Sequence, residues 1–175
     1  MSQSTLHRLS TTLGRVAETV GNTAAWLALA LVLVTFSVVV LRYLFEIGSI
    51  ALQESILYLH ASVFLLGASY TLKVDGHVRV DIFYRHLSNR AKALVNLLGT
   101  LLLLLPVCSF LLWISWDYAA TAWSLREGSS ETGGLPYVYL LKSLIPAAAL
   151  LLILQGISQT LHSVATIVRA RGEHT

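Results

Sequence analysis

Two histidines, His60 and His162, fall in long apolar stretches of the chain, where a histidine pair on facing helices could bind a haem iron. His60 lies in the half of its stretch that is nearer one membrane face, and His162 lies near the opposite face. The two therefore differ in depth by most of a bilayer and cannot both bind one iron within this chain. A helix contact for His60 and an interfacial position for His162 are the simpler interpretations.

Asp75, His77 and Asp81 offer oxygen and nitrogen donors in a short stretch, which could indicate a metal site. A helix would place Asp75 and His77 on different faces, and no further acid nearby completes a coordination shell. Helix capping and surface pairing therefore explain these residues better. The chain also lacks a G-x-S-x-G motif for a nucleophilic serine. We expect no enzyme activity, no bound metal and no cofactor.

Acidic residues within the bilayer would indicate ion or proton coupling, because a carboxylate at the bilayer centre costs about 2.5 to 3.5 kcal/mol and is kept mainly for function. The candidates are Glu46, Glu54 and Asp117, and all three fall near the ends of apolar stretches. This placement argues against a pump that works alone.

The apolar stretches themselves determine the fold class. The chain has 175 residues, of which 55% are hydrophobic and only 12% are charged, which is too apolar for a soluble domain. Four stretches of at least 18 residues carry no charge, and each is long enough at about 1.5 Å per residue to cross most or all of a hydrocarbon core of about 30 Å. The sequence therefore predicts one all-α membrane domain over 1–175. We expect transmembrane helices at 22–44, 53–72, 93–117 and 136–166, with a loop at 118–135.

The lysines and arginines are distributed unevenly between the two sides of this predicted bundle. One side carries nine: Arg8, Arg15, Lys73, Arg79, Arg85, Arg90, Lys92, Arg169 and Arg171. The other carries three: Arg42, Arg126 and Lys142. The positive-inside rule places the first group in the cytoplasm, with both termini, and the loop at 118–135 in the periplasm. The net charge of +3 thus reflects topology, and we expect no nucleic-acid partner.

Two further segments show helical periodicity outside the spans. Residues 5–20 have apolar side chains at three- and four-residue spacing, typical of an amphipathic helix on the membrane surface. An extension of the first transmembrane helix that packs on a partner is equally consistent with this narrow stripe. Residues 76–90 carry an apolar face at Val80, Phe83, Tyr84 and Leu87, which predicts a cytoplasmic interfacial helix. A strand is disfavoured because a helical bundle offers it no pairing edge, although the first few residues could be extended.

Small and amide residues within the spans indicate helix contacts. Gln155, Gln159 and His162 share one face of the fourth predicted span, and Gly67 permits close approach of a second helix. Packing within the chain and packing against an external partner explain these residues equally well. Pro106 and Pro146 each remove one backbone hydrogen bond, so both should bend their helices.

Two sequence motifs resemble a known family. GHVRVDIFYRHLS follows LLGASYTLKVD after the second predicted span, and LRYLFEIGSIALQES ends the first span and opens the second. Both resemble the small, DctQ-type integral-membrane subunit of tripartite ATP-independent periplasmic (TRAP) transporters, and the resemblance extends from about Leu13 to about Ser163. It implies a bacterial inner-membrane protein without catalytic activity. Its expected partners are a large TRAP membrane subunit, a periplasmic substrate-binding protein and membrane lipids.

The resemblance also implies a division of labour. The large subunit would carry the sodium and substrate sites and move as an elevator, so that sodium coupling needs no cofactor in this chain. The small subunit would scaffold the large one and help dock the binding protein, which selects an organic acid. The expected partner-interface residues are Arg42, Tyr43, Glu46, Glu54, Gly67, His77, Arg79, Asp81, Arg126, Glu127, Gln155 and Gln159. The alternatives are a free-standing four-helix membrane cytochrome and a small autonomous carrier.

Overall fold

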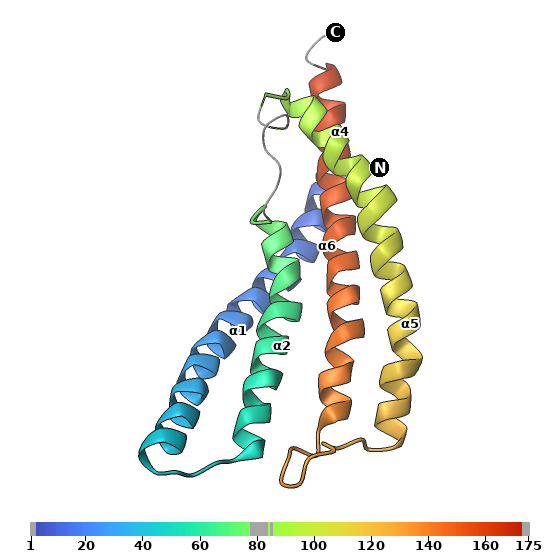
Figure 1. Cartoon of the computed structure of the whole chain (residues 1–175). Coiled ribbons are helices and arrows are strands. Elements are labelled where there is room, and N and C mark those ends of the chain that lie inside the picture. The colour runs from blue at the N-terminus through green and yellow to red at the C-terminus, as the bar shows by residue number, and fades with distance from the viewer. Residues whose placement is uncertain (1–2, 78–83, 85, 173–175) are drawn as a thin grey trace.

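The computed structural model of the chain describes residues 3–77, 84 and 86–172. In this part of the chain all regular structure is helical. Its elements in chain order are α1 (Gln3–Leu44), α2 (Ile50–Lys73), α4 (Asn89–Gly99), the π-helix η1 (Thr100–Leu104), α5 (Leu105–Ser124) and α6 (Val138–Gly172). Figure 1 shows these helices as one elongated bundle.

Within the described residues, four helical stretches are long and apolar enough to span a membrane, which confirms the predicted fold class. They are Gly14–Leu44, Ile50–Lys73, Asn89–Ser124 and Val138–Val168. The shortest has 24 residues and is about 36 Å long at about 1.5 Å per residue, which exceeds the hydrocarbon thickness of about 30 Å.

Helix α6 lies at the centre of the bundle. It packs against α1, α2, α4, η1 and α5, and α1 and α2 also pack closely against each other. One end of the bundle carries the start of α1, the end of α2, the start of α4 and the end of α6; we call it the terminal end (Figure 1). The other carries the short connections 45–49 and 125–137, and we call it the hairpin end.

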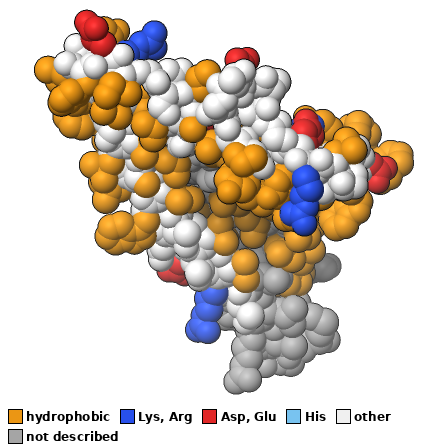
Figure 2. Space-filling view, turned by 90° about the horizontal axis from the view of Figure 1, so that it is seen from below, with side chains coloured by type: hydrophobic (Ala, Val, Ile, Leu, Met, Phe, Trp, Pro, Cys, Tyr) orange, Lys and Arg blue, Asp and Glu red, His pale blue; other side chains and the backbone are white. Residues whose placement is uncertain are grey.

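The distribution of side chains is the reverse of that in a soluble protein. Among the described residues, the buried hydrophobic side chains are alanines and Cys108, whereas the buried polar ones are serines, a threonine and a glutamine. The large apolar side chains lie outside: Trp26, Phe64 and Trp113 are 72 to 75% exposed. Figure 2, which views the hairpin end, shows hydrophobic side chains over much of the outer surface. Small residues inside let helix backbones approach closely, and large apolar residues outside match lipid.

The first helix is longer than the predicted span. The segments predicted at 5–20 and 22–44 form the single helix α1, because neither a proline nor a cap interrupts it. At their junction, a Cβ on Gly21 would collide with the ring of Tyr70 on α2. Because Gly21 has no side chain, Tyr70 can pack directly against the backbone of α1. Most of the predicted interfacial helix at 76–90 lies outside the described residues. Ser88 caps α4, accepting a hydrogen bond from Ala91 N at 3.3 Å.

A π-helical turn interrupts the third span just before Pro106. The N–H of Leu105 donates to the carbonyl oxygen of Thr100, five residues earlier. The missing N–H of Pro106 accounts for the irregular turn that precedes it. Gly156 of α6 packs on this turn, where an added Cβ would lie 2.9 Å from Leu104 Cδ2. Pro146 lies inside α6, which the structure describes as one helix.

Candidate functional site

The hairpin end is held together by the carboxylate of Glu54, which lies in the first turns of α2. Its Oε1 accepts a hydrogen bond from Ser129 Oγ, and its Oε2 accepts one from the N–H of Leu135 at 2.6 Å. Within the 125–137 connection, Ser129 N donates to Leu135 O at 3.0 Å. The N–H of Glu131 donates to Ser129 Oγ at 3.0 Å. We call these contacts of Glu54 with the connection the Glu54 clasp; they fix the 125–137 connection on α2.

A second set of contacts fixes the same connection on α5 and α6. Lys142 of α6 donates to both carboxylate oxygens of Glu127, at 2.6 and 2.8 Å. Its ammonium also lies 4.1 Å from the ring centroid of Tyr118 on α5. Glu54 and Glu127 were both expected at a partner interface, and the structure places each carboxylate in contacts within the chain. The side chain of Glu127 is 36% exposed, and the expectation that either residue also contacts a partner stays a prediction.

Arg126 projects its charge from this ordered connection. Its guanidinium carbon lies 5.7 Å from the ring centroid of Trp123 and 5.8 Å from that of Tyr139. Trp123 is itself held by a hydrogen bond from Nε1 to Ser143 Oγ at 2.7 Å. The backbone of Arg126 has a φ of 49°, in the left-handed region. Arg126 is exposed, so its cation is both positioned by the rings and accessible.

The other connection at the hairpin end carries three more predicted interface residues. Arg42 and Tyr43 end α1, and both are exposed. Glu46 follows with a φ of 56°, where the chain reverses toward α2. The N–H of Ile47 donates to Leu41 O at 2.9 Å, which closes this turn on the helix end. Arg42, Tyr43 and Glu46 therefore lie at the same end of the bundle as Arg126.

Gly67 lies where α2 faces α1. A Cβ added to Gly67 would lie 4.0 Å from Ala24 Cβ, an ordinary contact distance. Gly67 therefore faces a helix of the same chain, at a distance that leaves room for a Cβ.

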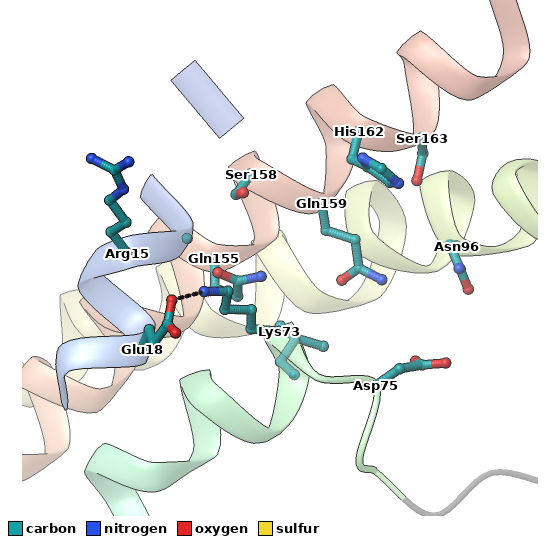
Figure 3. A pocket seen from close by; sticks show the side chains of 12 residues that line it. Arg15, Glu18, Lys73, Asp75, Asn96, Gln155, Ser158, Gln159, His162 and Ser163 are labelled. Carbon is teal, nitrogen blue, oxygen red and sulfur yellow. Dashed lines mark hydrogen bonds and ion pairs between the residues drawn. The ribbon is translucent and has the colours of Figure 1, made fainter. Parts of the chain in front are cut away.

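A polar cleft of about 620 Å³ opens at the terminal end. Its floor is α6, which contributes Gln155, Ser158, Gln159, His162 and Ser163. Figure 3 shows these side chains along α6, with side chains from α1 and α2 on one side and Asn96 of α4 on the other. We refer to this site as the polar cleft.

An ion pair between α1 and α2 lies in the polar cleft. Lys73 Nζ lies 2.7 Å from Glu18 Oε2 (Figure 3). Gln155 is only 6% exposed. Within the described part of the chain, Oε1 of Gln155 and Oε1 of Gln159 are buried and have no hydrogen-bond partner. The sequence placed the two glutamines on one helix face, and the structure brings that face to the cleft.

His77, another predicted interface residue, lies at the same end of the bundle. His77 is exposed, four residues beyond the end of α2. Arg79 and Asp81 lie outside the described residues. Among the residues that the structure describes, no group of three or more His, Cys, Asp or Glu side chains could hold a metal ion.

Sequence reasoning missed the Glu18–Lys73 pair and the contacts at Gly21 and Gly156. Each depends on which residue of a second helix lies opposite, and no local motif reports that.

Comparison with known proteins identifies the family. A model of the DctQ component of tripartite ATP-independent periplasmic transporters matches residues 31–166, which is more than three quarters of the chain. No curated protein and no solved structure matches. The match includes two of the four spans completely and nearly all of Val138–Val168, together with the Glu54 clasp and both glutamines of the polar cleft. The chain therefore belongs to the DctQ family and is the small membrane component of a TRAP transporter.

Proposed function

We propose that this chain is the non-catalytic scaffold of a sodium-driven TRAP importer of organic acids in a bacterial inner membrane. A large membrane subunit would bind sodium and substrate, and the small subunit would hold its stationary part. The match to the DctQ family over residues 31–166 carries this proposal. The outward-facing apolar side chains support it as well, because a second membrane protein could pack on them as readily as lipid.

The proposed orientation places the hairpin end in the periplasm and the terminal end in the cytoplasm. Described basic residues at the terminal end include Arg15, Lys73, Arg90 and Lys92, whereas Arg42, Arg126 and Lys142 lie at the hairpin end. Counted over the whole sequence, the excess of basic residues is on the terminal side, which supports a cytoplasmic location for both termini.

The hairpin end would help dock the periplasmic binding protein. The Glu54 clasp and the Glu127–Lys142 pair hold the 125–137 connection before any partner arrives. Such a preformed surface loses little conformational entropy on binding. Arg126 supplies an accessible cation, which favours an acidic patch on the partner.

Reconstitution tests the scaffold proposal. The chain is co-expressed with the large membrane protein encoded beside it, extracted in a mild detergent and placed in liposomes with the matching binding protein. We expect co-purification, and uptake of a labelled organic acid only when all three proteins and an inward sodium gradient are present. Sodium-driven uptake by the chain alone, or purification without any large subunit, would contradict the proposal.

A charge substitution tests the docking role. Arg126→Ala should raise the concentration of loaded binding protein needed for half-maximal uptake by roughly tenfold, since an interfacial charge contact is commonly worth that much. Arg90→Ala removes an exposed cation at the terminal end and is the matched control. Equal effects of the two substitutions would show that Arg126 has no part in docking.

A further inference from the structure

The polar cleft lies at the depth of a lipid headgroup. Along α6, Gln155 is about 26 Å and Gln159 about 32 Å from Val138 at the hairpin end, taking about 1.5 Å per residue. A hydrocarbon core is about 30 Å thick, so both amides fall at its far boundary. Lys73, the last residue of α2, contributes to the cleft at the same level.

Two glutamines that line the cleft carry buried acceptor oxygens for which the described residues supply no donor. Gln155 is 6% exposed, and within the described residues neither its Oε1 nor the buried Oε1 of Gln159 has a partner. The two residues are four positions apart on α6, so both oxygens belong to one helix face. In Figure 3 the side chain of Gln159 projects into the space between Lys73 and Asn96. A ligand that complements this site must bring hydrogen-bond donors.

Among the described residues that line the cleft, the charges of the basic and acidic side chains balance. Arg15 and Lys73 are cationic, Glu18 and Asp75 are anionic, and all four side chains line the site. Lys73 uses one donor on Glu18 Oε2 at 2.7 Å, and an ammonium group has three donors. It can therefore also bind a phosphate oxygen. This combination suits a zwitterion better than a ligand with a net negative charge.

The size and surroundings of the cleft suit a headgroup. Its volume is about 620 Å³, and a water molecule occupies about 30 Å³ in the liquid. The cleft therefore has room for about twenty water molecules, far more than a single ion needs. Helices α2 and α4 both pack on α6, but they do not pack closely against each other, so the cleft lies between them over α6. On α4, the apolar side chains of Leu94 and Leu98 are exposed, where the acyl chains of a lipid could contact them.

We propose that the polar cleft binds the headgroup of phosphatidylethanolamine. Its primary ammonium donates to the Oε1 atoms of Gln155 and Gln159, and its phosphate accepts from Lys73. Phosphatidylcholine carries the same phosphate but no N–H donor, and phosphatidylglycerol carries no ammonium. The site therefore selects by the ammonium group, whereas a basic surface patch would select by negative charge.

Lipid titration of the delipidated full chain tests this assignment. Native mass spectrometry in detergent measures the binding of phosphatidylethanolamine, phosphatidylcholine and phosphatidylglycerol with identical acyl chains. The variants are Gln155→Leu, Gln159→Leu and the double substitution, which remove the acceptors at similar volume. Gln53→Leu is the matched control, because Gln53 is exposed at the hairpin end. Circular dichroism and the retained background binding of the other two lipids report that each variant is folded.

We expect one phosphatidylethanolamine to bind roughly tenfold more tightly than either other lipid. The double substitution should abolish that preference, and Gln53→Leu should leave it intact. Equal binding of the three lipids, or a preference that survives the double substitution, would overturn the proposal. Soluble phosphoethanolamine that binds as tightly as the lipid would assign the site to a free solute. A complex with the large subunit in which protein fills the cleft would assign it to that partner, and either result overturns the lipid assignment.

The lipid titrations use this chain alone and do not depend on the transport proposal. Failure of lipid selection leaves co-purification and uptake untouched, and failure of those assays leaves lipid selection untouched.

Discussion

Replacement of Gly21 by alanine should weaken the packing of α1 on α2. The added Cβ would lie 2.6 Å from Tyr70 Cβ and 2.7 Å from Tyr70 Cδ2. Carbon atoms in contact are normally about 3.5 to 4.0 Å apart, so this pair must separate by about 0.9 Å or more. Tyr70 Cβ is attached to the backbone of α2 and cannot rotate away. The two helices must therefore shift, and such overpacking typically costs about 1 to 3 kcal/mol.

Gly99→Ala is the matched control for this substitution. Gly99 also has helical dihedral angles, and a Cβ added there meets nothing within 4 Å. Each substitution gains about 1 kcal/mol of helix propensity, which cancels when the two variants are compared. We therefore expect Gly21→Ala to be less stable than Gly99→Ala by about 1 to 3 kcal/mol. The measurement is equilibrium unfolding by SDS in mixed micelles, followed by circular dichroism. Two variants whose free energies of unfolding agree within about 0.5 kcal/mol would refute the tight contact between α1 and α2.

Three further predictions concern the hairpin end and the inverted interior. Glu54→Ala should speed hydrogen exchange of the amides in the 125–137 connection by roughly tenfold, because the clasp is lost. An unchanged exchange rate would show that other contacts hold the connection. Ala149→Leu should lower the free energy of unfolding in detergent by about 1 to 3 kcal/mol, since Ala149 is 3% exposed and a larger side chain overpacks the interior. Leu150→Ala, at a 48% exposed position, should change the free energy of unfolding by less than about 1 kcal/mol. Equal costs of the two substitutions would contradict the inside-out packing. A cysteine at Glu131 should react with a membrane-impermeant maleimide added outside spheroplasts, and one at Asn89 only after lysis; the reverse pattern would invert the topology.

The fold class could be predicted because a membrane-spanning helix is visible in the sequence as a long uncharged stretch. A long stretch without charge must cross the bilayer as a helix, since lipid cannot satisfy exposed backbone groups. The boundaries were less predictable. The third helical span continues to Ser124, seven residues beyond the predicted end at 117, because nothing in its sequence stops a helix there. The π-turn before Pro106 falls within a run of leucines, which has the same apolar pattern in α- and π-geometry.

In the candidate site, too, features within one helix could be predicted, whereas contacts between helices could not. Gln155 and Gln159 could be recognised from their four-residue spacing, because one helix determines their common face. What those amides face depends on α1, α2 and α4, and helical periodicity does not report how helices are arranged around each other. The sequence places Glu54 at the edge of an apolar stretch, near the membrane boundary. Its contacts with Ser129 and Leu135 join residues 75 and 81 positions away, which no local pattern can indicate.

The Glu54 clasp has a consequence for how the protein is made. Leu135 emerges from the ribosome 81 residues after Glu54, when α1 and α2 are already synthesised. The first helical hairpin must therefore insert and persist with its carboxylate unsatisfied by the protein, until the second hairpin arrives. Formation of the clasp is therefore a late step of folding, which joins the second hairpin to the first. A chain arrested before Leu135 would present an open α1–α2 hairpin to the quality-control proteases of the membrane.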